Sequence, residues 1–251
     1  MDGALYAQID DRLKSVYPFE EEVSLRTKIS VSELKHRNMI LEPGDEEALA
    51  WYAKEEKTES YVPLFVRGEG EVAADVPHQG ALRGTAMHRM MECLDYGALA
   101  DVFTQEEVKR QLDTLQRNGR ISAEVAALVN VRKIWDFLQT DLAGRIMQAH
   151  KNEKLYREQP FVMGLPAHET DPAIHSEQLV LVQGIIDLYF EEADGLVLLD
   201  YKTDSVKEAK QLLERYQTQM DLYAQALAAA TGKPVKEKLI YSFKLEEIIE
   251  A

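Results

Sequence analysis

The sequence predicts an α/β fold in which a block of helices precedes most of the strands. Three observations support this prediction: apolar residues at helical spacing from residue 84, a change to β-branched and aromatic residues after residue 150, and a long helical segment before the last predicted strand. The predicted order is helix, helical insert, three strands, helix and strand.

Composition limits the possible functions. The chain has 251 residues, of which 45% are hydrophobic, enough for a substantial core. Its net charge of -15 disfavours unspecific adhesion to nucleic acid or to an anionic membrane, so any DNA site must be local. The single cysteine, Cys93, excludes an intramolecular disulfide and a four-cysteine zinc or iron–sulfur site within this chain.

The same features suggest a location. One cysteine fits a reducing compartment, so we expect the protein to be cytoplasmic. No apolar run approaches the roughly 20 residues that span a bilayer, and the acidic start lacks the pattern of a signal peptide. We therefore expect no membrane association.

The first 83 residues are expected to be peripheral. Residues 1–27 predict an acidic connector, and residues 28–83 predict a peripheral helix and a linker. Ser30 and Glu33 have the spacing of a capping box, which predicts a helix starting at Val31 or Ser32. Residues 42–80 are rich in Glu, Gly and Pro without a sustained period, which is typical of a loop or a partly disordered linker.

Helical patterns follow between residues 84 and 150. Four apolar residues define one face of a helix over about 84–95: Met87, Met90, Met91 and Leu94. Thr104 and Glu107 then make a second capping box, ahead of a helix that Gly119 ends. The helical insert covers about 100–150 and carries no obvious polar chemistry of its own.

Strand patterns dominate the remainder. Residues 155–165 and 179–191 predict two strands, and the second forms a hairpin with the run that ends in DYKTD at residue 204. Residues 206–232 predict a long helix that Gly232 and Pro234 end, and residues 235–243 predict a final strand. The sequence has no GxxxxGK[ST] phosphate loop, so this chain is not expected to hydrolyse ATP.

The hairpin places two acidic residues on one face. A two-residue turn at Asp194–Gly195 sets Asp187 opposite Lys202, with Asp200 on the same side and the two carboxylates on a diagonal of roughly 7–8 Å at the backbone. A four-residue turn would set the two aspartates directly opposite each other, and a three-residue loop would send Asp187 to the other face.

Two interpretations of this group remain open from the residues alone. Lys202 and the carboxylates of Asp187 and Asp200 could form a structural ion pair at a strand end. They could instead form an oxygen-rich site for Mg²⁺ or Mn²⁺, hard cations that take carboxylate ligands and engage phosphates. Phosphodiester hydrolysis needs such a metal and a nearby cation to orient the nucleophile or stabilise developing charge.

Four motifs in order give the chain a family resemblance. GTAMHRMME (84–92), the Gly184–Leu188 segment, DYKTD (200–204), and Gln219 with Tyr223 together resemble the nuclease domain of the RecB-like branch of the PD-(D/E)XK superfamily. The resemblance implies a restriction-endonuclease-like core over residues 84–251, with a mixed β-sheet flanked by helices.

The resemblance also implies roles for particular residues. It implies that His88, Asp187, Asp200 and the backbone carbonyl of Tyr201 bind the metal, and that Lys202 acts with Asp187 and Asp200 in catalysis by activating water. Gln219 and Tyr223, one helical turn apart, are expected to lie beside the site and contact DNA or hold the catalytic groups, although they could simply anchor their helix to the sheet. Glu158 resembles a secondary position that faces the site.

Within this branch, the segments KISVSELKHR, LYREQPF and DYKTD look most like the C-terminal nuclease region of the larger subunit of bacterial AddAB-type ATP-dependent helicase-nucleases. This implies a Mg²⁺-dependent deoxyribonuclease, with Mn²⁺ as a possible substitute, that cuts single-stranded DNA during double-strand break processing for homologous recombination. It further implies a helicase region upstream of residue 1 that uses ATP, and an AddB-like partner. The alternatives are a catalytically idle DNA-guiding or subunit-docking domain and a free-standing RecB-like nuclease.

Overall fold

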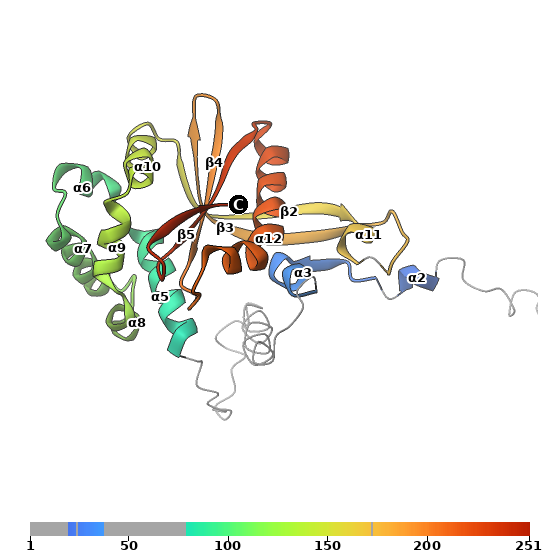
Figure 1. Cartoon of the computed structure of the whole chain (residues 1–251), viewed down its shortest axis with the longest axis horizontal. Coiled ribbons are helices and arrows are strands. Elements are labelled where there is room, and N and C mark those ends of the chain that lie inside the picture. The colour runs from blue at the N-terminus through green and yellow to red at the C-terminus, as the bar shows by residue number, and fades with distance from the viewer. Residues whose placement is uncertain (1–19, 24, 38–78, 172) are drawn as a thin grey trace, which may run out of the picture. The chain divides into compact units, whose positions relative to one another are not determined.

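The computed structural model describes residues 20–23, 25–37, 79–171 and 173–251 (Figure 1). Most of the predicted acidic connector and nearly all of the predicted linker at 42–80 lie outside these residues. Among the described helices, none is long and apolar enough to cross a membrane.

A six-stranded mixed sheet forms the centre of the fold, which confirms the predicted α/β class. The strands follow the spatial order β1-β3-β4-β5-β6, and β2 pairs with β3. β3–β4 and β5–β6 are antiparallel, whereas β1–β3 and β4–β5 are parallel. The strands are β1 (Lys28–Ser30), β2 (Leu155–Pro166), β3 (Leu179–Glu192), β4 (Gly195–Lys202), β5 (Val235–Ser242) and β6 (Glu247–Glu250).

The hairpin turn differs from the prediction by one residue. Glu192 pairs with Gly195, so the turn residues are Ala193 and Asp194 instead of Asp194 and Gly195. Gly195 has a φ of 155°, and a Cβ there would lie 2.8 Å from the carbonyl oxygen of Pro234. Glycine is therefore needed in the first position of β4, where another backbone approaches closely.

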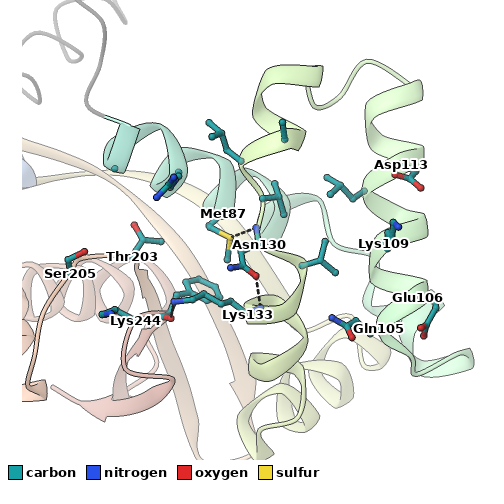
Figure 2. A pocket seen from close by; sticks show the side chains of 18 residues that line it. Met87, Gln105, Glu106, Lys109, Asp113, Asn130, Lys133, Thr203, Ser205 and Lys244 are labelled. Carbon is teal, nitrogen blue, oxygen red and sulfur yellow. Dashed lines mark hydrogen bonds between the residues drawn. The ribbon is translucent and has the colours of Figure 1, made fainter.

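The helical insert and the helix before it form one block against the sheet. Five of these helices start with a side-chain cap, from Asp95, Thr104, Ser122, Asn130 and Thr140; Figure 2 shows Asn130 accepting the Lys133 N–H. The helices are α5 (Gln79–Cys93), α6 (Tyr96–Asp101), α7 (Gln105–Arg117), α8 (Ala123–Leu128), α9 (Val131–Leu138) and α10 (Asp141–Lys151). Predicted to start at about residue 84, α5 begins five residues earlier, at Gln79.

These helices cover one face of the sheet. Their apolar side chains join those of alternate residues on β3, β4 and β5, including Leu188, Leu199 and Tyr241, in a single buried cluster. The intervening residues, Asp187 and Asp200 among them, therefore point away from this cluster.

The long helix α12 (Ala209–Thr231) connects the parallel strands β4 and β5 and lies on the side of the sheet away from the insert (Figure 1). Glu208 and Gln211 form a capping box at its start. Gly232 ends it, as the sequence predicts, and does so in the left-handed conformation, with a φ of 68°. The helix α3 (Val31–Arg37) begins at Val31, as its capping-box spacing predicts, and contacts α12.

The structure divides into two compact units. The smaller unit holds the described residues of 1–30 and 162–183; it includes α2 (Glu20–Val23), β1, α11 (Ala167–Thr170) and the adjoining ends of β2 and β3. Within it, Ser176 Oγ donates a hydrogen bond of 2.8 Å to Glu22. The larger unit holds the described residues of 31–161 and 184–251, and all of the predicted site residues belong to it.

Two short strands were missed by the sequence patterns. β1 has three residues and β6 has four, of which two are glutamates. Such segments are too short for period-2 alternation to stand out, and their strand structure depends on pairing with β3 and β5.

Candidate active site

The β3–β4 hairpin positions the two aspartates. The recorded pairing of the two strands ends at Leu188 and Leu199, and Asp187 and Asp200 are the next residue on each strand, instead of lying on a diagonal as the predicted turn would have it. The two carboxylates still share one face. Asp187 Oδ2 also accepts the backbone N–H of Tyr201 at 2.9 Å, which fixes the carboxylate against the neighbouring strand.

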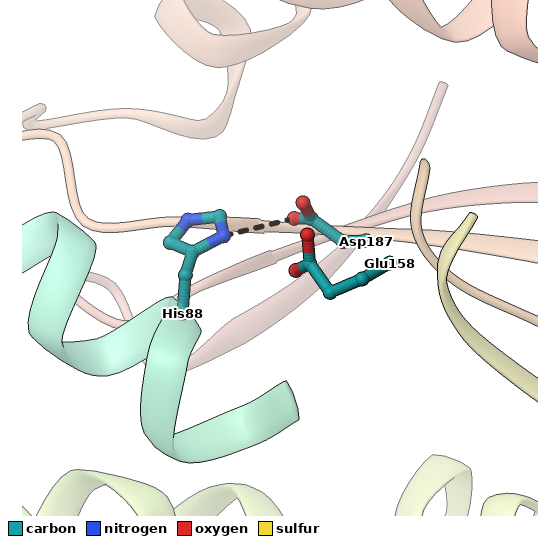
Figure 3. Close-up of side chains that lie close together, drawn as sticks. All are labelled: His88, Glu158 and Asp187. Carbon is teal, nitrogen blue, oxygen red and sulfur yellow. Dashed lines mark ion pairs between the residues drawn. The ribbon is translucent and has the colours of Figure 1, made fainter. Parts of the chain in front are cut away.

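The helix α5 brings His88 to Asp187. Met87, Met90 and Met91 are buried and anchor the helix. Nδ1 of His88 lies 3.3 Å from Asp187 Oδ2, and the imidazole side chain remains 30% exposed (Figure 3). Burial lowers the pKa of His88, but attraction to the Asp187 carboxylate outweighs it, so the net pKa is raised. For Asp187 burial raises the pKa, and His88 reverses this to a net lowering.

Glu158 completes a compact group with these two residues. One ligand atom from each of His88, Glu158 and Asp187 lies within 4.8 Å of the others. Figure 3 shows the Glu158 and Asp187 carboxylates side by side, facing the imidazole. Burial, reinforced by the charge of Asp187, raises the pKa of Glu158 to about 7.

The backbone of Glu158 is also unusual. Its φ is 48°, in the left-handed region that few residues other than glycine adopt. Residues held in this region often lie at functional sites, where the surrounding structure compensates for the strain. This conformation supports a functional assignment for Glu158.

Asp200 and Lys202 form a buried ion pair beside this group. Their side chains are 2% and 12% exposed, and Lys202 Nζ lies 2.6 Å from Asp200 Oδ2. Burial raises the pKa of Asp200 against the opposing effect of Lys202, and the Asp187 charge raises it further. Burial lowers the pKa of Lys202, but attraction to Asp200 and Asp187 raises it overall, so the ammonium stays charged.

The helix α12 contributes three side chains to the site. Gln219 Nε2 donates to Asp200 Oδ1 at 3.2 Å. Tyr216 lies one turn earlier and places its ring 4.1 Å from Lys202 Nζ, and its hydroxyl donates to Asp204. Tyr223 lies one turn later; burial and then the charge of Asp200 raise the pKa of its hydroxyl.

Gly184 has a steric reason to lack a side chain. A Cβ at this position would lie 2.8 Å from the ring of Phe161 and 3.1 Å from the ring of Tyr223, which pack together in an edge-to-face arrangement. The glycine of the Gly184–Leu188 segment thus lets Tyr223 approach β3 three residues before Asp187.

The donor set fits a hard divalent cation. Two carboxylates and an imidazole converge within 4.8 Å, and an oxygen-rich set of this kind suits Mg²⁺ or Mn²⁺. Asp200 Oδ2 accepts no regular hydrogen bond from the described residues; its contact is the ion pair with Lys202. This oxygen therefore retains capacity for a further electrostatic partner.

The sequence-predicted residues come together in this region. His88, Asp187, Asp200, Lys202, Gln219 and Tyr223 all adjoin one group, and for Tyr201 the structure records an N–H donated to Asp187. Glu158, predicted as secondary, lies in the compact donor group.

Two supporting residues were missed by sequence reasoning, Tyr216 and Asp204. Helical spacing gave a signal for Tyr216, which is three residues before Gln219 and seven before Tyr223. Asp204 lies within DYKTD, but its contact with Tyr216 depends on how the loop after β4 packs on α12.

Comparison with known proteins places the chain in a family. Residues 64–249 match the PD-(D/E)XK nuclease superfamily. The chain is 34% identical over 254 residues to an ATP-dependent helicase/nuclease subunit from Clostridium novyi (strain NT), and 39% identical over 252 residues to one from Thermoanaerobacter sp. (strain X514). These alignments cover 99% and 98% of this chain but 19% of each relative. The chain belongs to the PD-(D/E)XK nuclease superfamily.

Proposed function

We propose that this chain is a Mg²⁺-dependent deoxyribonuclease domain that hydrolyses phosphodiester bonds of single-stranded DNA. One observation carries the proposal: His88, Glu158 and Asp187 converge on one point, beside the buried Asp200–Lys202 pair. Membership of a nuclease superfamily gives this arrangement its chemical context.

Each residue has a role in the proposed mechanism. His88, Glu158 and Asp187 would hold the cation, with Asp200, which pairs with Lys202, next to them. When bound, the cation neutralises charge on the phosphoryl oxygens and makes a water molecule more acidic. Lys202 keeps its proton and stabilises the negative charge that develops on the phosphoryl group as water attacks.

The residues of α12 hold Lys202 and Asp200 in position. Gln219 fixes Asp200 through Oδ1, which leaves Oδ2 directed at Lys202. Tyr216 covers the ammonium group with its ring, restricting the lysine to this region. Such fixed charges stabilise a transition state without reorganising during the reaction.

The relatives suggest a wider setting for the reaction. Their names describe one subunit of an ATP-dependent helicase/nuclease, and the chain spans about a fifth of their length. We infer that an ATP-driven motor outside this chain delivers the strand, together with an AddB-like partner, in double-strand break processing for recombination. A net charge of -15 supports delivery over independent capture, because affinity for DNA depends on cations that neutralise phosphates.

The decisive experiment compares cleavage of labelled single-stranded DNA by the wild type, Asp187→Asn and Asp200→Ala, with and without Mg²⁺. We expect cleavage only with the metal and a loss of at least about 100-fold in each variant, as is typical when a group that stabilises transition-state charge is removed. Asp221→Ala is the matched control, since Asp221 is on α12 and pairs with the surface residue Lys238. Undiminished cleavage by Asp200→Ala would show that the site is misassigned; absence of cleavage by the wild type would favour an idle DNA-guiding or docking domain.

A further inference from the structure

A second feature of the larger unit is a pocket of about 890 Å³ that contains none of the proposed catalytic residues. Its walls come from α5, the helical insert, the loop after β4 and the turn after β5. Figure 2 shows Thr203, Ser205 and Lys244 along one wall and Lys109 with Glu106 along the opposite wall. The insert thus supplies most of the residues that line this concave surface, although its sequence shows no obvious chemistry of its own.

The charge of the pocket is opposite to that of the chain. Four cationic side chains line it, with two carboxylates, Glu106 and Asp113, whereas the whole chain carries -15. Arg83, Lys109 and Lys244 are exposed and form no ion pair with the residues that the structure describes. The fourth cation, Lys133, donates to the carbonyl of Phe243 and joins α9 to the end of β5. Three cations are therefore available to a ligand.

The pocket also offers polar contacts. Thr203, Ser205 and Asn130 place hydroxyl and amide groups along it, and the buried side chains of Met87, Leu112 and Phe243 lie beneath them. Grooves for single-stranded nucleic acid place cations and polar groups along the phosphates, and this pocket offers both.

The pocket adjoins the catalytic group through shared segments. Thr203 follows Lys202 directly, and Met87 precedes His88. The N–H of Phe243 donates to the carbonyl of Lys202 at 2.9 Å, so one pocket wall is fastened to the catalytic lysine. At Gly84 a Cβ would lie 2.9 Å from Thr203 Oγ1, which shows how closely α5 passes the end of β4.

We propose that this pocket binds the sugar-phosphate backbone of single-stranded nucleic acid and leads the strand to or from the catalytic group. The proposal rests on the proposed nuclease function and assigns the path of the substrate. Arg83, Lys109 and Lys244 neutralise phosphates, and the helical insert forms the outer wall of the path.

The test measures binding apart from catalysis. A fluorescent oligothymidylate is titrated with protein in metal-free buffer over a series of salt concentrations, using the wild type and the triple variant Arg83→Ala/Lys109→Ala/Lys244→Ala. The control is Lys28→Ala/Lys151→Ala/Lys210→Ala, which removes three exposed cations outside the pocket and changes the net charge equally. Thermal unfolding verifies that both variants are folded.

We expect the dissociation constant of the pocket variant to rise by about tenfold. The slope of the logarithm of the binding constant against the logarithm of the salt concentration should become shallower by about two, at roughly 0.7 for each lost phosphate contact. The control should stay within about twofold of the wild type, since its cations face other surfaces. Equal binding and equal salt dependence in the two triple variants would overturn the proposal and leave an acidic protein segment as the alternative occupant.

A second readout separates this proposal from the nuclease function. Mn²⁺-dependent hydrolysis of bis(p-nitrophenyl) phosphate needs the catalytic group but no strand path, so the pocket variant should retain the wild-type rate. Loss of this hydrolysis in the pocket variant would contradict the proposal that the pocket guides the strand without taking part in the chemical step. A wild type that binds the oligonucleotide through the pocket yet hydrolyses neither substrate would refute the nuclease function and leave the binding site standing.

Discussion

Glu158 is the residue whose protonation should govern metal binding. Its pKa is raised to about 7 by burial and by Asp187, so it is mostly neutral at pH 6 and ionised at pH 8. His88 also has a raised pKa and must lose a proton to become a ligand.

We therefore predict that the affinity for Mn²⁺ rises from pH 6 to pH 8. At pH values below the pKa of a ligand side chain, each proton that the metal displaces makes the affinity rise by up to about tenfold per pH unit. Glu158→Gln should bind more weakly at pH 8 and show a shallower pH dependence, because one titrating ligand is then removed. Calorimetric titration at several pH values measures both effects. Glu247→Gln, which changes an exposed carboxylate on β6, is the control; a Glu158→Gln profile parallel to that of the wild type would exclude Glu158 as a ligand.

At the scale of residues, local spacing predicts the direction in which a side chain points better than it predicts contacts with distant segments. Asp200 and Lys202 could be placed on one face because strand alternation depends only on local spacing, and Asp187 could be added because the turn has two residues, as predicted. The position of Glu158 in the donor group could not be predicted, since it depends on a φ of 48° within β2 and on its closeness in space to Asp187. The contact of Gly184 with Tyr223 likewise joins segments far apart in the chain.

At the scale of elements, Arg145 ties the helical insert to the sheet. From α10 it donates to Glu192 at the end of β3, at 2.9 and 3.0 Å, and to Glu237 on β5, at 2.8 and 2.7 Å. Arg145 holds the pKa of Glu192 at about 2. Paired, bidentate contacts of this kind are stronger than isolated surface ion pairs.

We predict that Arg145→Met lowers the free energy of unfolding at pH 7 by about 1–2 kcal/mol. The loss is modest because the arginine side chain is 32% exposed and water screens the ion pairs. The Glu192 contribution is present above its unfolded pKa of 4.5 and is lost as the pH falls towards 2. The difference between variant and wild type should therefore narrow between pH 5 and pH 3.

Urea unfolding at these pH values tests the prediction. Arg132→Met, which removes an 84% exposed arginine of α9, should leave stability unchanged. A stability difference for Arg145→Met that is independent of pH would mean that its contribution comes from packing of the side-chain stem and not from the carboxylates.

The elements themselves followed from local patterns wherever they were long. The capping residue Thr104 and the helix ends at Gly119 and Gly232 agree with prediction because caps are decided by a few neighbouring side chains. The hairpin turn was wrong by one residue because the choice of turn depends on the approach of Pro234 to Gly195, across the β4–β5 pairing. That contact joins residues far apart in the chain, so a short stretch of sequence does not predict it.

At the scale of the whole molecule, an acidic chain concentrates carboxylates at one point. The chain carries a net charge of -15, and three of its carboxylates, Asp187, Asp200 and Glu158, lie in partly or fully buried positions in the proposed catalytic group. Lys202 and His88 compensate for part of this charge. A divalent cation bound here would relieve the remaining repulsion, so metal binding and folding should be linked.

We predict that saturating Mn²⁺ raises the midpoint of thermal unfolding. At a concentration 100 times the dissociation constant, a ligand that binds only the folded state stabilises it by about 2.7 kcal/mol. For a chain of this size that corresponds to about 5–10 °C. NaCl at matched ionic strength should produce a smaller shift, because it screens charge without occupying the site. Asp187→Asn should lose the Mn²⁺-specific part while keeping the NaCl response. If Asp187→Asn and the wild type gained equally from Mn²⁺, the ion would be stabilising the acidic surface in general, and the metal site would have to lie elsewhere.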